Sequence, residues 1–222
     1  MTMAEMQGFG KMDINDRGGK HTYEYDDVAT TPATPGLTPS QTVGPFFAYG
    51  LTPGPYGYAH EEIHETDLTT PELDGERIVV EGQVLDSNGV AVHDAVVEFI
   101  QADASGTYAS EPRNDGFTGF GRCGTGPDGK DGKKTYQFHT VKPGATQDGA
   151  APFITVIVTM RGLLNHCITR IYFPGDDVSQ DPVMKQVPAE RRQTLMAQET
   201  GPGRYRFDIH MQGDNETVFF DL

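Results

Sequence analysis

The chain of 222 residues has few basic residues, few cysteines and no long apolar run. It contains 17 Lys and Arg residues against 32 Asp and Glu, which gives a formal net charge of -15. Because an acidic surface repels phosphate backbones and anionic lipid headgroups, this charge argues against nucleic acid and membrane surfaces as partners. An anionic substrate would therefore need a local basic residue.

The shortage of cysteine bears on the cellular compartment. Cys123 and Cys167 are too few for a disulfide-stapled secreted domain, and neither lies in a Cys-x-x-Cys pair. No apolar run approaches membrane-spanning length, and residues 1–20 lack the apolar core of a signal peptide. These absences predict a soluble, cytoplasmic protein with two buried or idle thiols.

Familiar catalytic signatures are absent or misplaced. No Gly-x-Ser-x-Gly nucleophile elbow occurs, and Gly116–Gly121 does not follow the dinucleotide-binding pattern. His60–His64 matches the His-Glu-x-x-His motif of zinc proteases, but Pro53, Pro55 and Pro71 bracket this short segment. The motif needs a packed helix and a third ligand, so we interpret the segment as a solvated acidic loop.

Gly and Pro are plentiful, with 27 and 15 residues, which favours many turns and short strands. Ser87-Asn88-Gly89 and Gly213-Asp214-Asn215 predict the turns of two hairpins. The segment from residue 116 to residue 134 is expected to be a loop. Strands are predicted from the apolar pattern over 77–85, 95–101, 136–139, 153–160, 167–173, 205–212 and 217–220. The run 153–160 is expected to be a central strand buried on both faces. Together these elements predict an all-β sandwich.

The remaining segments are expected to be less regular. Residues 188–199 form the one predicted helix, since Pro188 starts a run of helix-favouring residues. Residues 1–37 have few large aliphatic side chains and are predicted to be a flexible N-terminal tail. Residues 38–75 contain five prolines and three tyrosines, which indicates an irregular arm that packs on a core or on another chain. The folded domain is therefore expected to span residues 38–222.

Several motifs in order resemble the intradiol ring-cleavage dioxygenases. The most specific is the entry segment 38–47, Thr-Pro-Ser-Gln-Thr-Val-Gly-Pro-Phe-Phe. The further matches are Gly75–Ile78, Gly82–Gly89, Val97–Asp103, Phe120–Arg122, His139–Gly144, Tyr172-Phe173, Tyr205–Ile209 and Glu216–Asp221. The resemblance covers about residues 38–222 and implies the prealbumin-like or Ig-like β-sandwich of that family.

The resemblance fails at the metal ligands. Catalytic chains of this family hold ferric iron with two tyrosines and two histidines. After its Lys-Pro-Gly this chain has Ala145–Gln147, without a tyrosine. The expected His-x-His strand reads Ala151–Thr155, and Phe117 stands instead of the second tyrosine. These side chains cannot supply the phenolate and imidazole donors of a ferric centre. The resemblance therefore implies an α-type chain without catalytic or metal-binding residues of its own.

The same resemblance implies a role and a set of site residues. An α-type chain would line an active site whose Fe(III) is held by a catalytic β subunit. The hetero-oligomer would use O2 to cleave protocatechuate between its hydroxyl-bearing carbons to 3-carboxy-cis,cis-muconate, in the catabolism of aromatic compounds. Thr42, Gly44, Pro45, Phe46 and Arg161 carry over as pocket lining. The arginine fork suits the substrate carboxylate. The alternatives are an ion pair for Arg161 and plain core packing for Phe46.

Two other functions remain open from the sequence. Gly82–Gly89 followed by Ala95–Val97 also resembles generic prealbumin-like sandwich repeats, so a non-catalytic binding module is one alternative. Such modules lack the entry segment and normally follow an export signal. A zinc protease that uses His60 and His64 is the other.

Overall fold

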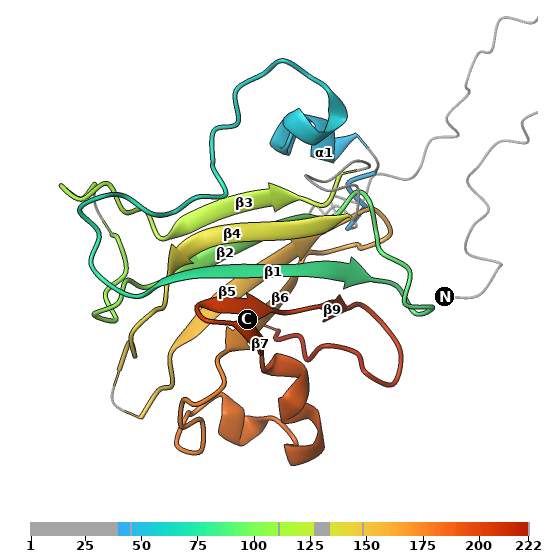
Figure 1. The fold of residues 1–222 in the computed structure, drawn as a ribbon. Coiled ribbons are helices and arrows are strands. Elements are labelled where there is room, and N and C mark those ends of the chain that lie inside the picture. Colours follow the sequence, from blue (N-terminus) through green and yellow to red (C-terminus); the bar gives the residue numbers. More distant parts are fainter. Residues whose placement is uncertain (1–39, 45, 111, 127–133, 148, 222) are drawn as a thin grey trace, which may run out of the picture. The chain divides into compact units, whose positions relative to one another are not determined.

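The strands of the chain form two sheets, which confirms the predicted all-β class (Figure 1). The computed structural model describes residues 40–44, 46–110, 112–126, 134–147 and 149–221. The predicted tail at residues 1–37 and Pro45 lie outside the described residues. No described helix is both long enough and apolar enough to cross a membrane.

The first sheet is centred on β1 (Arg77–Leu85), and its strand order is β4-β1-β8-β7, with β9 also paired to β1. β1 lies antiparallel to β4 and parallel to β8 and β9. The remaining strands of this sheet are β4 (Thr135–Val141), β7 (Gln198–Gly201), β8 (Arg204–Arg206) and β9 (Ile209–His210).

The second sheet has the order β3-β2-β5-β6, and all its neighbouring strands are antiparallel. Its strands are β2 (Val96–Gln101), β3 (Phe120–Gly124), β5 (Phe153–Thr159) and β6 (Cys167–Tyr172). The predicted central place of the 153–160 run is confirmed. The burial expected on both of its faces is wrong, because inward residues of β5 alternate with half-buried ones such as Ile157.

The core lies between the two sheets, since each strand points alternate side chains inward. Phe99 of β2 stacks on Phe138 of β4, with ring centroids 3.9 Å apart, and this contact joins the sheets. The fully buried apolar side chains around this pair come from both sheets: Ile78, Val80, Val84, Val97, Tyr136, Ile154, Val156, Val158, Ile171 and Ile209.

Two predicted hairpins differ from the structure. After the confirmed turn at Gly89, Val92 pairs with Val84, but β2 then enters the second sheet. The apolar faces of β1 and β2 thus meet across the core instead of sharing one face. The predicted strand 205–212 is split into β8 and β9. At the break, the Gln83 N–H of β1 donates to Asp208 Oδ1 at 2.9 Å instead of to a backbone carbonyl, so the ladder is interrupted there. Residues 217–220 form no strand among the described residues. The Thr217 N–H donates to the His210 carbonyl of β9 at 2.9 Å, and Phe220 forms a bridge with Ile168.

The helices of the structure also differ from the prediction. A short helix, α1 (Phe47–Leu51), lies in the arm that was expected to be irregular, followed by the 3-10 turn η2 (Gly54–Tyr56). The single predicted helix is a 3-10 helix, η4 (Ala189–Leu195), preceded by η3 (Met184–Gln186). A 3-10 helix rises further per residue than an α-helix, which suits a segment anchored by Pro188 and by buried Leu195.

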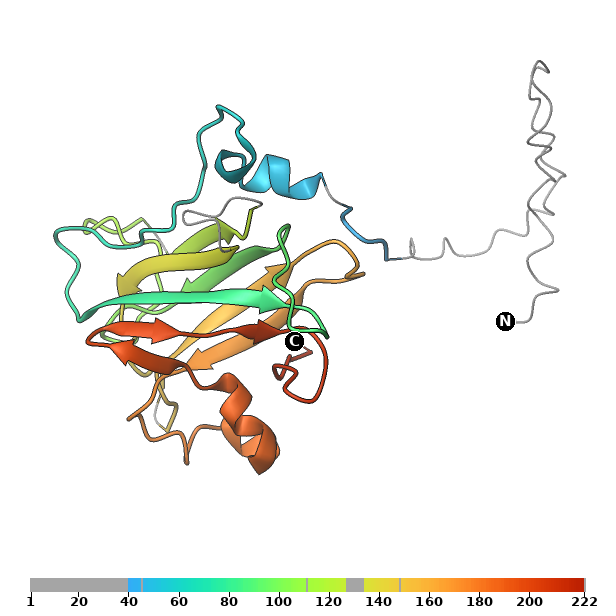
Figure 2. The same cartoon turned by 45° about the vertical axis from the view of Figure 1, so that its right-hand side comes forward.

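β3 lies inside the segment 116–134 that was predicted to be a loop. Its glycines suggest a loop, but their role is close packing. A side chain at Gly121 would collide with Leu68, and one at Gly124 would collide with Thr52. The arm therefore packs closely on β3. In both views α1 and η4 lie on opposite sides of the sheets (Figures 1 and 2).

Candidate functional site

The entry segment and the loop after β5 meet on one surface. Thr42 Oγ1 accepts a hydrogen bond from the Gly162 N–H at 2.9 Å. Because Gly162 follows Arg161 directly, the structure brings two members of the predicted lining set, Thr42 and Arg161, to the same place. Gly44 lies two residues further along with φ of 73°, and space is open where its side chain would stand.

Arg161 is held by two neighbouring residues of the segment that precedes β2. Its Nε lies 2.7 Å from Asp94 Oδ2, and its Nη2 lies 3.1 Å from His93 Nε2. The Asp94 side chain is 5% exposed, whereas that of Arg161 is 48% exposed. The ion pair considered as the alternative for Arg161 is thus present. The contacts with Asp94 and His93 are made by Nε and Nη2, and Nη1 contacts neither of these two residues.

Phe46 begins a group of aromatic side chains on the arm. It is 72% exposed, so the alternative of plain core packing is wrong within this chain. Its ring lies 5.6 Å from that of Tyr49, which also packs against Tyr56 and Tyr58. The other large hydrophobic side chains exposed on the arm and on the loop after β5 are Val43, Leu51, Ile63 and Leu164. These side chains, together with those of Phe46 and Tyr58, expose apolar area to water.

Tyr56 links the arm to the residues that hold Arg161. Its hydroxyl donates to the backbone carbonyl of His93 at 3.2 Å. Burial and the nearby Asp94 carboxylate raise the pKa of Tyr56 to about 12, so it remains a hydrogen-bond donor at neutral pH. Sequence analysis missed Tyr56, His93 and Asp94. The contacts of His93 and Asp94 with Arg161 depend on the pairing of β2 with β5, and Tyr56 joins them through the His93 carbonyl.

Two of the positions that match the family's iron ligands, Phe117 and Phe153, are filled by buried aromatic side chains. Phe153 is 7% exposed and lies in a small apolar cluster with Tyr172 and Met184. The Arg170 guanidinium lies over its ring, 3.9 Å from the centroid. Phe117 is buried in the main core. Among the described residues, no group of three or more His, Cys, Asp or Glu side chains is arranged to hold a metal ion.

The His60–His64 segment lacks the helix that the zinc-protease motif requires. Glu62 accepts a hydrogen bond from the Gly54 N–H at 3.3 Å, and the His64 ring packs edge-on against Phe120. The two imidazoles are therefore not presented side by side on a helical face, which removes the structural basis of that hypothesis.

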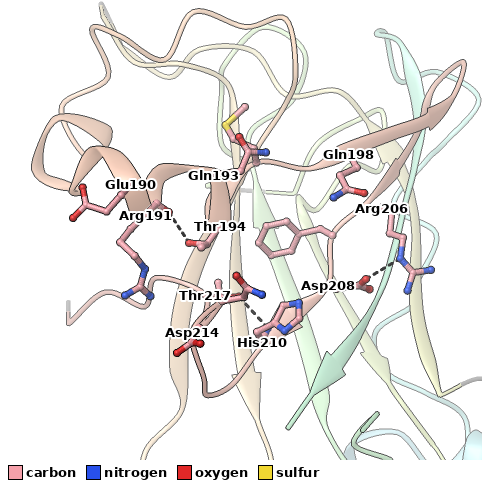
Figure 3. A pocket seen from close by; sticks show the side chains of 13 residues that line it. Glu190, Arg191, Gln193, Thr194, Gln198, Arg206, Asp208, His210, Asp214 and Thr217 are labelled. Atoms are coloured by element: carbon pink, nitrogen blue, oxygen red, sulfur yellow. Dashed lines mark hydrogen bonds and ion pairs between the residues drawn. The ribbon is translucent and has the colours of Figure 1, made fainter. Parts of the chain in front are cut away.

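A pocket of about 360 Å³ lies beside η4 and β9, on the side of the domain opposite α1 (Figures 1 and 3). It contains none of the predicted site residues. Its charged groups are mixed in sign and partly paired, as in the contact of Arg206 Nε with Asp208 Oδ2 at 2.9 Å. The labelled side chains around it include Glu190, Arg191, His210, Asp214 and Thr217. This pairing leaves no single ligand chemistry favoured.

The comparisons with known proteins agree with this fold. A family model described as "Dioxygenase" matches residues 44–213. A solved structure of a mutant of Acinetobacter radioresistens catechol 1,2 dioxygenase is similar with a TM-score of 0.50 at 16% identity, over 65% of this chain and 55% of that one. At that identity the likeness concerns the fold alone.

Curated relatives define the family more closely. The alpha chain of Burkholderia cepacia protocatechuate 3,4-dioxygenase is 48% identical over 195 residues, covering 83% of this chain and 97% of the relative. The Pseudomonas putida alpha chain is 40% identical over 200 residues, covering 83% and 96%. The Burkholderia cepacia beta chain is 34% identical over 163 residues, covering 64% and 67%.

The chain therefore belongs to the intradiol ring-cleavage dioxygenase family, as the sequence resemblance predicted. Within that family it is similar to protocatechuate 3,4-dioxygenase alpha chains across nearly their full length.

Proposed function

We propose that this chain is the alpha subunit of a cytoplasmic protocatechuate 3,4-dioxygenase and completes an active site in a catalytic beta subunit. The observation that carries the proposal is the near-full-length similarity to alpha chains, combined with Phe117, Phe153 and Thr155 at the positions of iron ligands. A non-catalytic binding module is disfavoured, because it explains neither the entry segment nor these relatives.

The reaction of the assembled enzyme is the intradiol cleavage of protocatechuate. Both atoms of O2 enter the product, 3-carboxy-cis,cis-muconate. Fe(III) bound in the beta subunit would activate the catecholate toward O2. The residues of this chain would bind and orient the substrate and exclude water from it.

The exposed apolar residues of the arm suit burial against the beta subunit. Phe46, Tyr58 and Leu164 would otherwise expose aromatic and aliphatic surface to water. The domain thus consists of a sandwich plus an arm, residues 38–75, that serves as interface and active-site entry. Residues 1–37 would form a separate flexible tail.

Arg161 would supply the counter-charge for the substrate carboxylate. Its outer guanidinium edge is available for two parallel hydrogen bonds, while Thr42, Gly44, Pro45 and Phe46 would line the same wall. The half-exposed state of Arg161 in the isolated chain supports this role.

Expression of the chain with and without its beta subunit tests the proposal. We expect iron and ring-cleavage activity only in the co-expressed complex. Stoichiometric iron in the lone chain, with turnover of protocatechuate, would contradict the proposal.

The Arg161→Ala variant of the complex tests the carboxylate role. Loss of a charged hydrogen bond, about 1.5–3 kcal/mol, should raise the KM for protocatechuate about 10- to 100-fold. The KM for catechol, which lacks the carboxylate, should change far less. Arg204→Ala is a matched control, because Arg204 is also 48% exposed and also pairs with one acidic residue, Glu81. Equal effects of Arg161→Ala on both substrates would reject the role.

A further inference from the structure

Asp94 is a buried carboxylate at a rigid point of the fold. It lies two residues before β2, and its neighbour Ala95 is fully buried. The Ala95 N–H donates to Thr125 Oγ1 at 3.1 Å, and the Thr125 N–H donates back to the Ala95 carbonyl at 2.9 Å. This reciprocal pair fixes the backbone next to Asp94, so the carboxylate projects from an anchored base.

The Asp94 carboxylate depends on Arg161 for its charge balance. Asp94 Oδ2 is shielded from water and accepts no hydrogen bond from the residues that the structure describes. The Arg161 Nε lies 2.7 Å away as an ion pair. A buried anion without a cation is strongly disfavoured, so Arg161 cannot swing freely into solvent although half of its side chain is exposed.

The geometry of the contact determines which part of Arg161 remains available. Nε and Nη2 lie on the same edge of a guanidinium. Here Nη2 lies 3.1 Å from His93 Nε2, and Nε lies 2.7 Å from Asp94 Oδ2 in an ion-pair contact without hydrogen-bond geometry. The His93 nitrogen can accept the Nη2–H only as a neutral imidazole with its proton on Nδ1. The outer edge, formed by Nη1 and the second hydrogen of Nη2, is the edge that remains for bidentate binding of another carboxylate.

Neighbouring contacts hold both sides of this arrangement. The Tyr56 hydroxyl fixes the His93 carbonyl from the arm, and Thr42 fixes the Gly162 N–H next to Arg161. A long flexible side chain is thus oriented before any ligand arrives. Preorganisation of this kind increases affinity, because the ordering of the side chain is not repeated on binding.

We propose that Asp94, supported by His93, is a positioning residue that directs the outer guanidinium edge of Arg161 toward the substrate carboxylate. The inference rests on the proposed role of Arg161 in protocatechuate binding. Asp94 itself does not touch substrate, so it should act only through Arg161.

The Asp94→Asn variant of the complex with its beta subunit tests this assignment. We expect the KM for protocatechuate to rise about tenfold, as misplacement of a binding group does, while kcat and the kinetics with catechol change less than about twofold. In the Arg161→Ala background, Asp94→Asn should add no further loss on protocatechuate. Asp208→Asn is the matched control, since Asp208 Oδ2 contacts Arg206 Nε at 2.9 Å on the other side of the domain.

The His93→Ala variant decides the matter if Asp94→Asn does not assemble. It removes the Nη2 contact without changing the charge of Asp94, and we expect the KM for protocatechuate alone to rise about threefold. A KM that rises equally for catechol would indicate a purely structural role and overturn the proposal. A KM that falls would show that Asp94 masks Arg161 and would overturn it too. No carboxylate-specific effect of Arg161→Ala would instead reject the proposed function of Arg161.

Discussion

Two loops of this chain each contain an arginine that pairs with an aspartate, and a glycine of positive φ, but they use these residues differently. The aspartate that pairs with Arg161 lies outside its loop, in the segment before β2. In the loop between β2 and β3, Arg113 contacts Asp103 through Nη1 and Asp115 through Nε and Nη2. Its guanidinium also lies 5.4 Å from the centre of the Phe117 ring. In the loop after β5, Arg161 is held along one edge only.

The glycines of these loops show the same contrast. Gly106 has φ of 85°, and a side chain there would collide with the backbone of Ala145. Gly162 has φ of 91°, and no atom of the described residues lies within 4 Å of the place where its side chain would stand. The first loop is therefore closed by packing and serves stability. The second loop leaves space and donors for something outside the chain.

The largest expected effect on stability comes from replacing each of the two glycines by alanine. Gly106→Ala adds a backbone collision to the strain of a positive φ, and we expect it to cost at least about 3 kcal/mol of stability. Gly162→Ala carries only the strain, about 1 kcal/mol. Urea unfolding midpoints of the co-expressed complex would measure both. Equal shifts would contradict the distinction between a closed and an open loop.

Asp103→Ala should have the next largest effect on stability. The Asp103 carboxylate accepts hydrogen bonds from the Ser105 hydroxyl, from the N–H groups of Ser105 and Thr107, and from Arg113. Loss of this set should cost about 2–4 kcal/mol, measured by urea unfolding at neutral pH. A shift no larger than that of Asp86→Ala, an aspartate with a similar turn role on an exposed hairpin, would contradict it.

The Asp103 carboxylate should also make the stability of the folded chain depend on pH in the acid range. Desolvation raises the pKa of Asp103, but the hydrogen bonds from Ser105 and Arg113 outweigh it and lower the pKa to about 2. The folded state thus stays ionised where the unfolded state is protonated. Its stabilisation is present above about pH 4 and is lost as the pH falls toward about 2. Plots of unfolding free energy against pH for the native chain and for Asp103→Asn should therefore converge as the pH falls from about 4 toward about 2.

Arg161 allows a smaller test of the open loop. Arg161→Ala leaves the buried Asp94 without its cation, which should cost about 1–2 kcal/mol, discounted because Arg161 is half exposed. Adding Asp94→Asn should recover part of that loss. Arg204→Ala, which breaks an exposed pair, should cost less than about 0.5 kcal/mol. Thermal unfolding of the native complex, the Arg161→Ala and Asp94→Asn single variants and their double variant would measure the coupling, with Arg204→Ala as the control. Strict additivity of the two single changes would contradict it.

Tyr56 should give the smallest effect. Burial and Asp94 raise its pKa to about 12, so the folded state keeps the phenol proton between pH 10 and pH 12 while the unfolded state releases it. The stabilisation is present below pH 10 and is lost as the pH rises through about 12. Tyr56→Phe should cost about 0.5–1 kcal/mol at neutral pH and flatten the alkaline loss. The prediction would be contradicted if the unfolding free energy of Tyr56→Phe fell as steeply with rising pH as that of the native chain.

Local pattern was sufficient for most of the strands but not for their partners. Alternation of apolar residues marks β1 and β4, because a strand in a sandwich buries every second side chain. It does not reveal that β1 and β2 lie in different sheets, since both bury a similar face. The glycines of β3 suggested a loop, because nothing local announces that Thr52 and Leu68 would pack on them.

The sequence by itself determined the all-β class, the family and the absence of tyrosine and histidine at the ligand positions, because these depend on residue identity and order. It also selected Thr42 and Arg161. Only the tertiary structure decided that these two meet, that Phe46 is exposed, and that Asp94 and His93 hold one edge of Arg161. The physical reason is that an ion pair forms between side chains brought together by the pairing of β2 with β5, and strand pairing is a property of the whole core.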